Sequence, residues 1–291
     1  MRLATISDGG REVAAVATAS GALPVSRINQ VHGTSFETDL FGLVKAGQVR
    51  ELRDSISGSS GGSAQGLFAG AIPHARVAYG PPYRHPRKIW GIGLNYVEHA
   101  SDLKEVSPSQ EPASFMKPDT TIIGPGDTIR LPGQSRRTTG EAELGVIIGR
   151  EAKDVSEEEA PAVVAGLTTV IDMTAEDILE KNPRFLTRAK SFDTFFSFGP
   201  QMVTLDEVDD VEALEVSTVI NGELHRKNLV SNMTFSPWFL VSFHSKVMTL
   251  LPGDIISTGT PGAVVIRSGD TVSCEITGFE TLSNPVAGQE G

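Results

Sequence analysis

Short hydrophobic runs separated by Gly, Pro and Ser recur along the chain, a pattern that predicts strands joined by turns. In about the first 70 residues these runs lead into the stretch SISGSSGGS at residues 55–63, which predicts a loop. A second break, GPPYRHP at residues 80–86, precedes a run at residues 88–92 that predicts a buried strand. We therefore expect a small N-terminal domain over residues 1–85 and a larger domain over residues 86–291.

Three later segments share a Gly-Asp pair followed by β-branched residues, which predicts a turn feeding a strand. These pairs are Gly126-Asp127, Gly253-Asp254 and Gly269-Asp270. A strand is also expected at residues 141–149 and another at residues 166–172.

Helical signals are fewer. A capping box of Ser156 and Glu159 predicts a helix over residues 156–165, and the pair Thr174 and Asp177 predicts another over residues 174–181. Ser236, followed by proline, predicts a third and strongly apolar helix that extends to residue 248 and serves as core or as core plus dimer interface.

Strands and helices do not alternate regularly along the chain, so a β-rich α+β fold is favoured over a doubly wound sheet. The segment GIGLNY at residues 91–96 begins like a dinucleotide-binding fingerprint. Tyr96 stands where the third glycine belongs, which excludes a Rossmann interpretation.

The composition narrows the choice of partners and compartment. A formal net charge of -11 disfavours nucleic acid and anionic membranes, because such surfaces repel an acidic protein. The single cysteine, Cys274, excludes an intrachain disulfide and a cysteine-based zinc site. Residues 1–10 lack the basic and apolar regions of a signal peptide, and no long apolar run follows, so we expect a cytoplasmic protein.

Three acidic residues are candidates for a cation site. Glu141 and Glu143 precede the run VII, and the period of two in a strand places both carboxylates on one face, about 7 Å apart along the backbone. Two acids at the start of a strand are usually just exposed, but the run after them predicts burial, where two carboxylates need a counter-charge. Asp172, at the predicted end of the next strand, is a candidate third ligand, although for this residue alone an acid at a helix N-terminus is the more usual explanation.

Three carboxylates without cysteine or a nearby histidine suit Mg²⁺ or Mn²⁺, with Ca²⁺ as a further candidate and Zn²⁺ disfavoured. Such a set leaves coordination positions open, as catalytic sites do. The residues thus predict a catalytic, and not a closed structural, divalent-metal site.

Seven motifs, in their order and spacing, resemble those of the fumarylacetoacetate hydrolase superfamily over about residues 86–286. They are GLNY at residues 93–96, FMKP at 115–118, EAEL at 141–144, IDMTA at 171–175, AKS at 189–191, NGE at 221–223 and TGTPG at 258–262. The resemblance implies a β-rich fold, a homodimer, and a Mg²⁺ or Mn²⁺ site at Glu141, Glu143 and Asp172. It also implies chemistry on β-diketo acids, acylpyruvates or 2,4-diketo-3-deoxy sugar acids.

The resemblance assigns further residues to the site. Lys190 matches the active-site lysine of the family, although a lone lysine is otherwise usually a surface residue. The residues implied to bind substrate are Tyr96, Phe115, Lys117, Gly259 and Thr260. Without the resemblance, Gly259 and Thr260 would indicate only a tight turn.

A candidate acid–base pair follows the GLNY motif. His99 and Asp102 share a face if this segment is helical, so Asp102 could orient the imidazole to activate water. Hydrolytic relatives carry a similar His–acid pair, typically with Glu at the second position, and Glu105 is an alternative partner here. The alternative is a surface histidine on a polar helix.

Two positions depart from the family pattern near the metal. Glu176 stands where many relatives have an arginine that meets a substrate carboxylate, and Leu179 stands where some have glutamine. We expect either that Arg188, with Arg184, restores the positive charge, or that the distal group of the substrate is neutral or hydroxylated.

The favoured function is hydrolysis of a C–C bond in a small oxo acid, because His99 and Asp102 provide a water-activating pair. Decarboxylation or tautomerisation of a related 2-oxo acid is the first alternative, since it needs the metal and Lys190 but not that pair. A non-catalytic, metal-stabilised binding protein is the second alternative.

Overall fold

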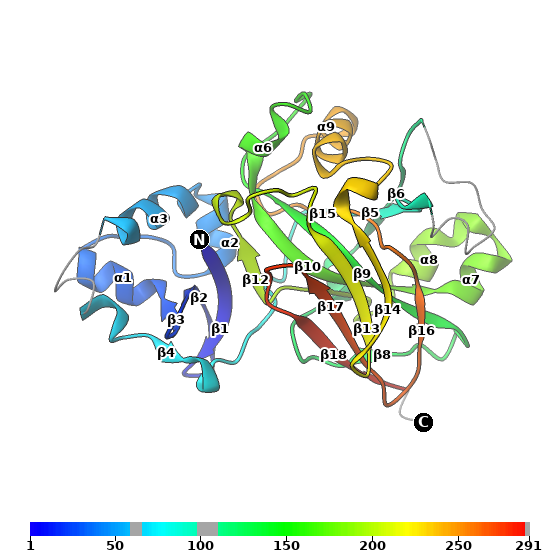
Figure 1. The fold of residues 1–291 in the computed structure, drawn as a ribbon, viewed down its shortest axis with the longest axis horizontal. Coiled ribbons are helices and arrows are strands. Elements are labelled where there is room, and N and C mark those ends of the chain that lie inside the picture. The colour runs from blue at the N-terminus through cyan, green and yellow to red at the C-terminus, as the bar shows by residue number, and fades with distance from the viewer. Residues whose placement is uncertain (59–65, 98–109, 289–291) are drawn as a thin grey trace.

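The computed structural model describes residues 1–58, 66–97 and 110–288. Its strands form one 13-stranded sheet and one five-stranded sheet (Figure 1). The β-rich α+β class that the sequence predicts is confirmed. Within the described ranges, no helix is long and apolar enough to cross a membrane.

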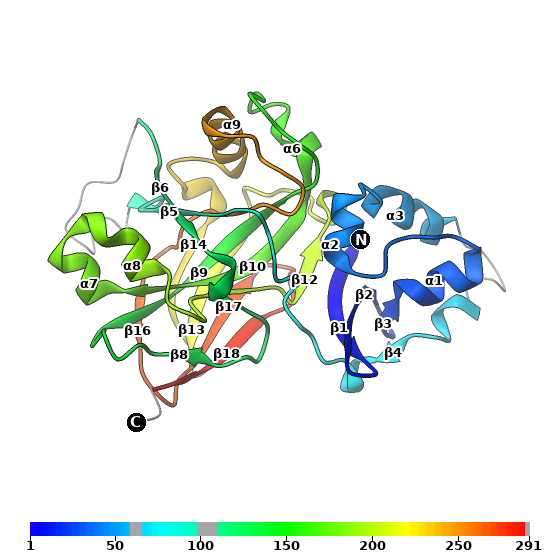
Figure 2. The same ribbon diagram turned by 180° about the vertical axis from the view of Figure 1, so that it is seen from behind.

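The N-terminal elements form a layer of strands covered by helices, at the left of Figure 1 and the right of Figure 2. Its strands are β1 (Arg2–Asp8), β2 (Arg11–Thr18), β3 (Gly21–Pro24) and β4 (Ile72–Pro73), and its helices are α1 (Val25–His32), α2 (Leu40–Lys45) and α3 (Val49–Ser57). Strand β1 also pairs antiparallel with β12 (Gln201–Val203), with Leu3 opposite Met202. The large sheet therefore runs through both predicted domains, and the boundary near residue 85 stays a prediction.

The rest of the large sheet surrounds two long antiparallel strands, β9 (Thr138–Ile148) and β10 (Val164–Ala175). Every residue of β9 is buried, as expected for a strand packed on both faces. The neighbouring strands of this sheet are β5 (Ile89–Gly93), β6 (Ala113–Lys117), β7 (Ile122–Ile123), β11 (Phe196–Phe198), β15 (Ile255–Ser257) and β16 (Val264–Ile266).

The five-stranded sheet packs against β9 and β10 and closes the main core. Its order is β14 (Glu223–Leu229), β13 (Glu215–Ile220), β17 (Thr271–Ile276), β18 (Leu282–Ala287) and β8 (Ile129–Arg130). Ala142, Leu144 and Val146 of β9 point into this core together with Val216 and Cys274. The alternate residues of β9, including Glu141 and Glu143, therefore face the other side of the sheet.

The three Gly-Asp turns have one common geometry, which confirms the predicted turns. Each glycine has a positive φ, namely 79° at Gly126, 87° at Gly253 and 94° at Gly269. Each following aspartate accepts a hydrogen bond from the backbone N–H three residues earlier, at 2.8 Å for Asp127 and 2.7 Å for Asp254 and Asp270. Glycine allows the left-handed backbone, and the aspartate closes the turn.

The helices match the sequence only in part. Helix α9 (Pro237–Val247) begins as predicted, with the Ser236 hydroxyl accepting from Phe239 N at 3.0 Å. The Ser156–Glu159 capping box forms, but the helix after it, α6 (Ala160–Val163), is short because β10 starts at residue 164. Helices α7 (Glu176–Lys181) and α8 (Leu186–Lys190) follow β10.

The predicted start of the helix at Thr174 is wrong. Thr174 lies in β10, directly opposite Thr139 of β9, and the helix begins only at Glu176. Pairing with β9 along the whole strand outweighs the local capping signal, as tertiary context commonly does. For the same reason Asp172 lies three residues inside β10 and not at its end.

Candidate metal centre

The register of β9 and β10 brings the three predicted carboxylates together. Asp172 lies directly opposite Glu141, and Glu143 follows two residues later on the same face of β9. One carboxylate oxygen from each residue lies within 4.8 Å of the other two, and all three residues are buried. The predicted acidic cluster is therefore present in the fold.

Hydroxyl groups on the same strand face orient Glu141. Thr139, two residues before it, donates to its Oε1 at 2.9 Å, and Thr174 from β10 donates to the same oxygen at 2.5 Å. The Thr174 hydroxyl can reach this oxygen because the residue is in the strand and opposite Thr139. The sequence analysis missed both threonines, although their period-two spacing from Glu141 and Asp172 was the available signal.

The next strand, β15, fixes Glu143. Ser257 donates to Glu143 Oε2 at 2.5 Å, and the backbone N–H of Gly259 donates to the same oxygen at 2.9 Å. Gly259 has a φ of 99°, and a Cβ there would lie 2.8 Å from the Cβ of Asn95. Glycine is required at this position for both reasons.

Two lysine side chains contact the carboxylates. Lys190, at the end of α8, places Nζ 2.8 Å from Glu141 Oε2 and 2.8 Å from Asp172 Oδ2. Lys117, from β6, places Nζ 2.5 Å from Asp172 Oδ1. The ring of Phe115 lies beneath both, with its centroid 4.9 Å from Lys190 Nζ and 5.9 Å from Lys117 Nζ. The structure thus brings Phe115, Lys117 and Lys190 together at the acidic cluster.

The two lysines have pKa values that move in opposite directions. Burial would lower the pKa of Lys190, but the charges of Asp172, Glu141 and Glu143 outweigh it and raise that pKa. Burial lowers the pKa of Lys117, with Asp172 opposing this effect and Lys190 adding to it. Lys190 is therefore the more firmly protonated of the two ammonium groups.

Glu143 ionises less readily than an ordinary glutamate, because its pKa is raised. Burial, followed by the charge of Asp172, raises its pKa to about 8. A buried carboxylate with this pKa is stabilised in its charged form by an added positive charge. Three converging oxygen donors held by threonine, serine and backbone groups fit Mg²⁺ or Mn²⁺, since both cations prefer oxygen ligands.

A buried asparagine connects the loops around this site, a role that the sequence analysis did not assign. Asn95 donates through Nδ2 to the carbonyl oxygens of Thr258 at 2.7 Å and Phe235 at 3.0 Å. Its Oδ1 accepts from Phe235 N at 2.9 Å. Because Thr258 immediately precedes Gly259, Asn95 fixes the loop whose N–H holds Glu143. Its position inside the GLNY motif was the only sequence signal.

The remaining predicted substrate-binding residues lie in different settings. Tyr96 is fully buried, and its backbone pairs with Met233. Thr260 is also buried, and its hydroxyl donates to Gly262 O at 3.2 Å. Their contact with substrate, like that of Gly259, stays a prediction.

Charges beside the cluster are paired differently from the expectation. Glu176 forms an ion pair with Arg137, a residue that the sequence analysis did not consider. Arg188 is exposed and donates to Gln134 Oε1 at 2.9 Å. Leu179 packs against the main core. The ion pair with Arg137 reduces the negative charge beside the cluster. A role for Arg188 stays a prediction.

The predicted acid–base pair lies outside the described residues. His99, Asp102 and Glu105 all fall in the range 98–109.

The protein is thus a β-rich α+β protein with a candidate divalent-metal centre on the paired strands β9 and β10. Residues 88–287 match the family described as fumarylacetoacetate (FAA) hydrolase, C-terminal, and the chain belongs to this family. The family resemblance proposed from the seven motifs is confirmed.

Relatives in this family differ in the reaction that they are named for. The chain is 38% identical over 224 residues to the mitochondrial oxaloacetate tautomerase fahd2 of Xenopus laevis, covering 74% of this chain and 70% of that protein. It is similar to the solved structure of a 5-carboxymethyl-2-hydroxymuconate delta-isomerase from Mycobacterium smegmatis, with 31% identity, a TM-score of 0.76 and coverage of 99% and 100%.

A third relative was solved with a metal. The maleylpyruvate hydrolase from Sphingobium sp. SYK-6, in complex with manganese(II) ion and pyruvate, is 28% identical, with a TM-score of 0.80 and full coverage of both chains. The family thus includes hydrolases, isomerases and tautomerases, with a manganese complex among them.

Proposed function

We propose that this protein is a divalent-metal-dependent tautomerase of a short 2-oxo acid, interconverting its enol and keto forms. The observation that carries the proposal is the cluster of Glu141, Glu143 and Asp172 in direct contact with Lys190 and Lys117. Enol–keto exchange needs negative charge stabilised on one oxygen and a proton moved at the adjacent carbon, and this cluster offers groups for both.

The three carboxylates would hold Mg²⁺ or Mn²⁺, which polarises the 2-oxo group when bound. Lys190, held by two acids, would keep its charge and stabilise the enolate oxygen. Lys117 contacts one acid and the carbonyl oxygen of Met173 at 3.4 Å, so it is held by fewer negative groups. We assign the movement of the proton to Lys117 Nζ. Phe115 would cover the site and keep water from these charges.

The identity of 38% to an oxaloacetate tautomerase supports this proposal. The Arg137–Glu176 ion pair supports a substrate that carries a carboxylate, because it lowers the local negative charge. An oxaloacetate-like dicarboxylic 2-oxo acid is the substrate class that we propose.

Hydrolysis of a C–C bond in an acylpyruvate is the second candidate, favoured by the 28% identity to maleylpyruvate hydrolase. It requires a base that activates water, and we propose His99 with Asp102 for that role. Decarboxylation would use the same cluster.

One experiment separates these reactions. Freshly dissolved enol-oxaloacetate and a set of acylpyruvates are incubated with protein and Mg²⁺ or Mn²⁺, and enol absorbance and product masses are followed together. Tautomerisation lowers the enol absorbance without a change of mass, hydrolysis yields two acids with the mass of one added water, and decarboxylation yields a product lighter by CO₂. Absence of any metal-dependent change would support the non-catalytic alternative and contradict the proposal.

The Glu141→Gln variant should be inactive in this experiment, because it loses a ligand from the cluster. Glu158→Gln is a suitable control, since Glu158 is an exposed acid in the turn before α6. Equal loss of activity in both variants would mean that the assay reports something other than this site.

A homodimer is proposed as the assembly. Phe239 of α9 stacks on Phe235 and Phe243, with ring centroids 5.2 and 6.1 Å apart, while Val247 at the end of the helix is 55% exposed. Sedimentation of the wild type and a Val247→Glu variant would test whether α9 lies at the interface. The exclusion of nucleic acid and membrane as partners, and the cytoplasmic location, stay predictions.

A further inference from the structure

A cleft separate from the carboxylate cluster lies between the N-terminal helices and the end of the β9–β10 pair where β9 ends and β10 begins. One wall comes from α2 and α3, including Val44, Val49 and Arg50. The opposite wall comes from the end of β9 and the beginning of β10, including Arg150 and Val164. The cleft has a volume of about 400 Å³, which is enough for a small organic molecule.

Arginines dominate the charge of this cleft. Arg50, Arg53 and Arg150 line it within the described part of the chain, whereas Asp206 is the only acid among the lining residues described. Asp206 is already engaged, since its carboxylate lies 3.3 Å from Arg53 and 3.4 Å from the N-terminal ammonium of Met1. This concentration of positive charge stands out in a protein of net charge -11.

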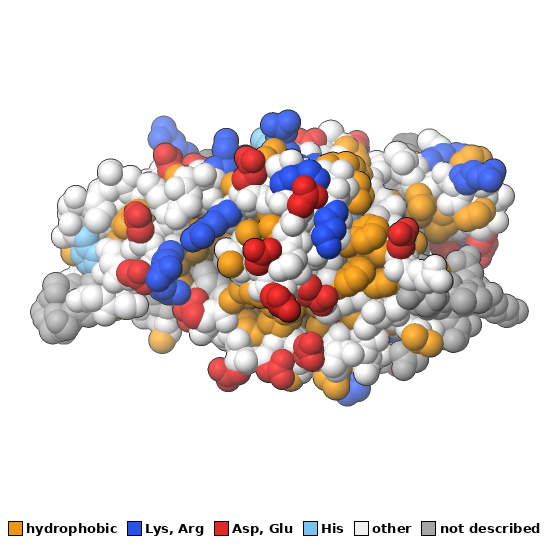
Figure 3. Space-filling model, turned by 90° about the horizontal axis from the view of Figure 1, so that it is seen from above, with side chains coloured by type: hydrophobic (Ala, Val, Ile, Leu, Met, Phe, Trp, Pro, Cys, Tyr) orange, Lys and Arg blue, Asp and Glu red, His pale blue; other side chains and the backbone are white. Residues whose placement is uncertain are grey.

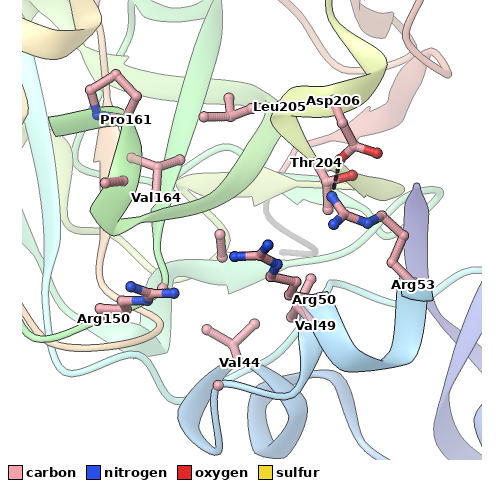
Figure 4. Close-up of a pocket in the computed structure, with 14 residues that line it drawn as sticks. Val44, Val49, Arg50, Arg53, Arg150, Pro161, Val164, Thr204, Leu205 and Asp206 are labelled. Atoms are coloured by element: carbon pink, nitrogen blue, oxygen red, sulfur yellow. Dashed lines mark ion pairs between the residues drawn. The ribbon is translucent and has the colours of Figure 1, made fainter. Parts of the chain in front are cut away.

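Two of the guanidinium groups have little or no compensation. Figure 4 shows those of Arg50 and Arg150 pointing into the same space from opposite walls. Arg50 approaches Asp54 only at 4.0 Å, and Asp54 also pairs with Arg53 at 3.0 Å. Arg150 forms no ion pair with the residues that the structure describes. Like charges that face one another across a cavity favour binding of an anion between them.

The walls also offer apolar contact. Val44, Val49, Pro161, Val164 and Leu205 line the cleft beside the arginines. In the view from above, Lys and Arg side chains are interspersed with acidic and hydrophobic side chains over the middle of this face (Figure 3). An occupant that combines a strongly anionic head with a small apolar body would use both features.

We infer that this cleft binds a small organic phosphate. A phosphate group presents oxygens in tetrahedral directions and carries close to two charges, so guanidinium groups can approach it from opposite sides. A carboxylate presents two oxygens in one plane with one charge and suits a single arginine fork. The site depends on residues 44–53, which precede the family-matched range 88–287, and it is independent of the proposed reaction.

Calorimetric titration with matched probes tests this inference on protein kept free of metal with EDTA. The probes are phenyl phosphate, benzoate and inorganic phosphate. Benzoate shares the aromatic ring of phenyl phosphate, and inorganic phosphate shares its head group. Phenyl phosphate is expected to bind about tenfold more tightly than benzoate, through the second guanidinium contact, and more tightly than inorganic phosphate, through ring burial.

Arg50→Gln and Arg150→Gln should each weaken phenyl phosphate binding by about tenfold or more. Arg76→Gln, which changes an exposed arginine outside the lining set, should leave it unchanged. Lys190→Met should bind phenyl phosphate as tightly as the wild type does. This result would show that the probe binds in the cleft and not at the carboxylate cluster. Melting curves without probe verify that the variants are folded.

Four results would overturn the inference, and three of them concern the probes and the arginine variants. They are no binding of any probe at millimolar concentration, unchanged binding in both the Arg50→Gln and Arg150→Gln variants, and benzoate binding as tight as that of phenyl phosphate. Loss of binding in Lys190→Met would place the probe at the other site and would overturn it as well.

Discussion

Glu141 and Asp172 face one another across the β9–β10 pair, and each holds Nζ of Lys190 at 2.8 Å. This bridge joins two candidate metal ligands to the candidate catalytic lysine without an intervening residue. A change in any of the three residues therefore alters the charge felt by the other two.

Metal binding should depend on pH through Glu143. Below its pKa of about 8 this carboxyl carries a proton, and a bound cation must displace that proton. The apparent affinity for Mn²⁺ should therefore rise by about tenfold per pH unit up to about pH 8 and then level off. Calorimetry in buffers of different ionisation enthalpy would measure the released proton. Glu143→Gln should bind weakly and without this pH dependence, and a flat profile in the wild type would refute the assignment.

Replacement of Lys190 by Met should separate turnover from metal binding. Loss of its charge should lower the turnover number by about a hundredfold or more, the usual effect of removing one stabilising donor. Mn²⁺ should bind at least as tightly, because a like charge has left the cluster. The exposed Lys246→Met is the matched control. A variant that loses both functions equally would show that Lys190 acts mainly in folding.

Removal of the Asn95 side chain should destabilise the protein. Asn95→Ala leaves the buried carbonyl oxygens of Phe235 and Thr258 and the N–H of Phe235 without their partner, at a cost of about 3 kcal/mol or more. Urea unfolding would measure the change, and Asn182→Ala, which removes one hydrogen bond at a surface turn, should cost about 1 kcal/mol or less. Comparable losses in the two variants would argue against this role for Asn95.

His244 should make the fold sensitive to mild acid. Its ring is buried in α9, with Nδ1 2.7 Å from Leu240 O and Nε2 2.8 Å from the Ser114 hydroxyl. Burial lowers its pKa below 6.5, although Leu240 opposes this shift. The unfolded chain therefore binds the proton more readily. This part of the stability is present above pH 6.5 and is lost as the pH falls, by up to about 1.4 kcal/mol per pH unit.

The measurement is the difference in free energy of unfolding between wild type and His244→Gln at pH 7.5 and pH 5. That difference should shrink at the lower pH, because the variant lacks the titrating ring. His225→Gln, at an exposed position, should show a constant difference from the wild type. A constant difference for His244→Gln as well would contradict the prediction.

The sequence predicts those parts of the site that depend on local periodicity. Glu141 and Glu143 share a face because they lie two residues apart in one strand. The pairing of Asp172 with Glu141 depends on the register between strands, which neither strand specifies alone. Thr174 shows the same limit, since its capping signal was local and its actual partner, Thr139, lies in another strand.

The partners of Glu176 and Glu143 could not be predicted for a related reason. Arg137 contacts Glu176, and Ser257 contacts Glu143, although the two residues of each pair lie far apart in the sequence. Only the folded chain brings them together. Turn chemistry, in contrast, is contained within four residues, and all three Gly-Asp turns were predicted. Local patterns therefore predict what an isolated segment determines, whereas the family motifs were needed to predict Asp172, Lys117 and Lys190 at the site.

The pairing of β1 with β12 has a practical consequence for work with this protein. A shortened chain that begins at residue 86 would lose β1 and expose the edge of β12 (Gln201–Val203) that faces it, while the pairing of β12 with β10 would remain. Exposed edges of this kind recruit strands from other molecules. Such a truncated chain should therefore self-associate at concentrations where the full chain does not, even if its carboxylate cluster is intact. Its solubility and its activity would have to be measured separately.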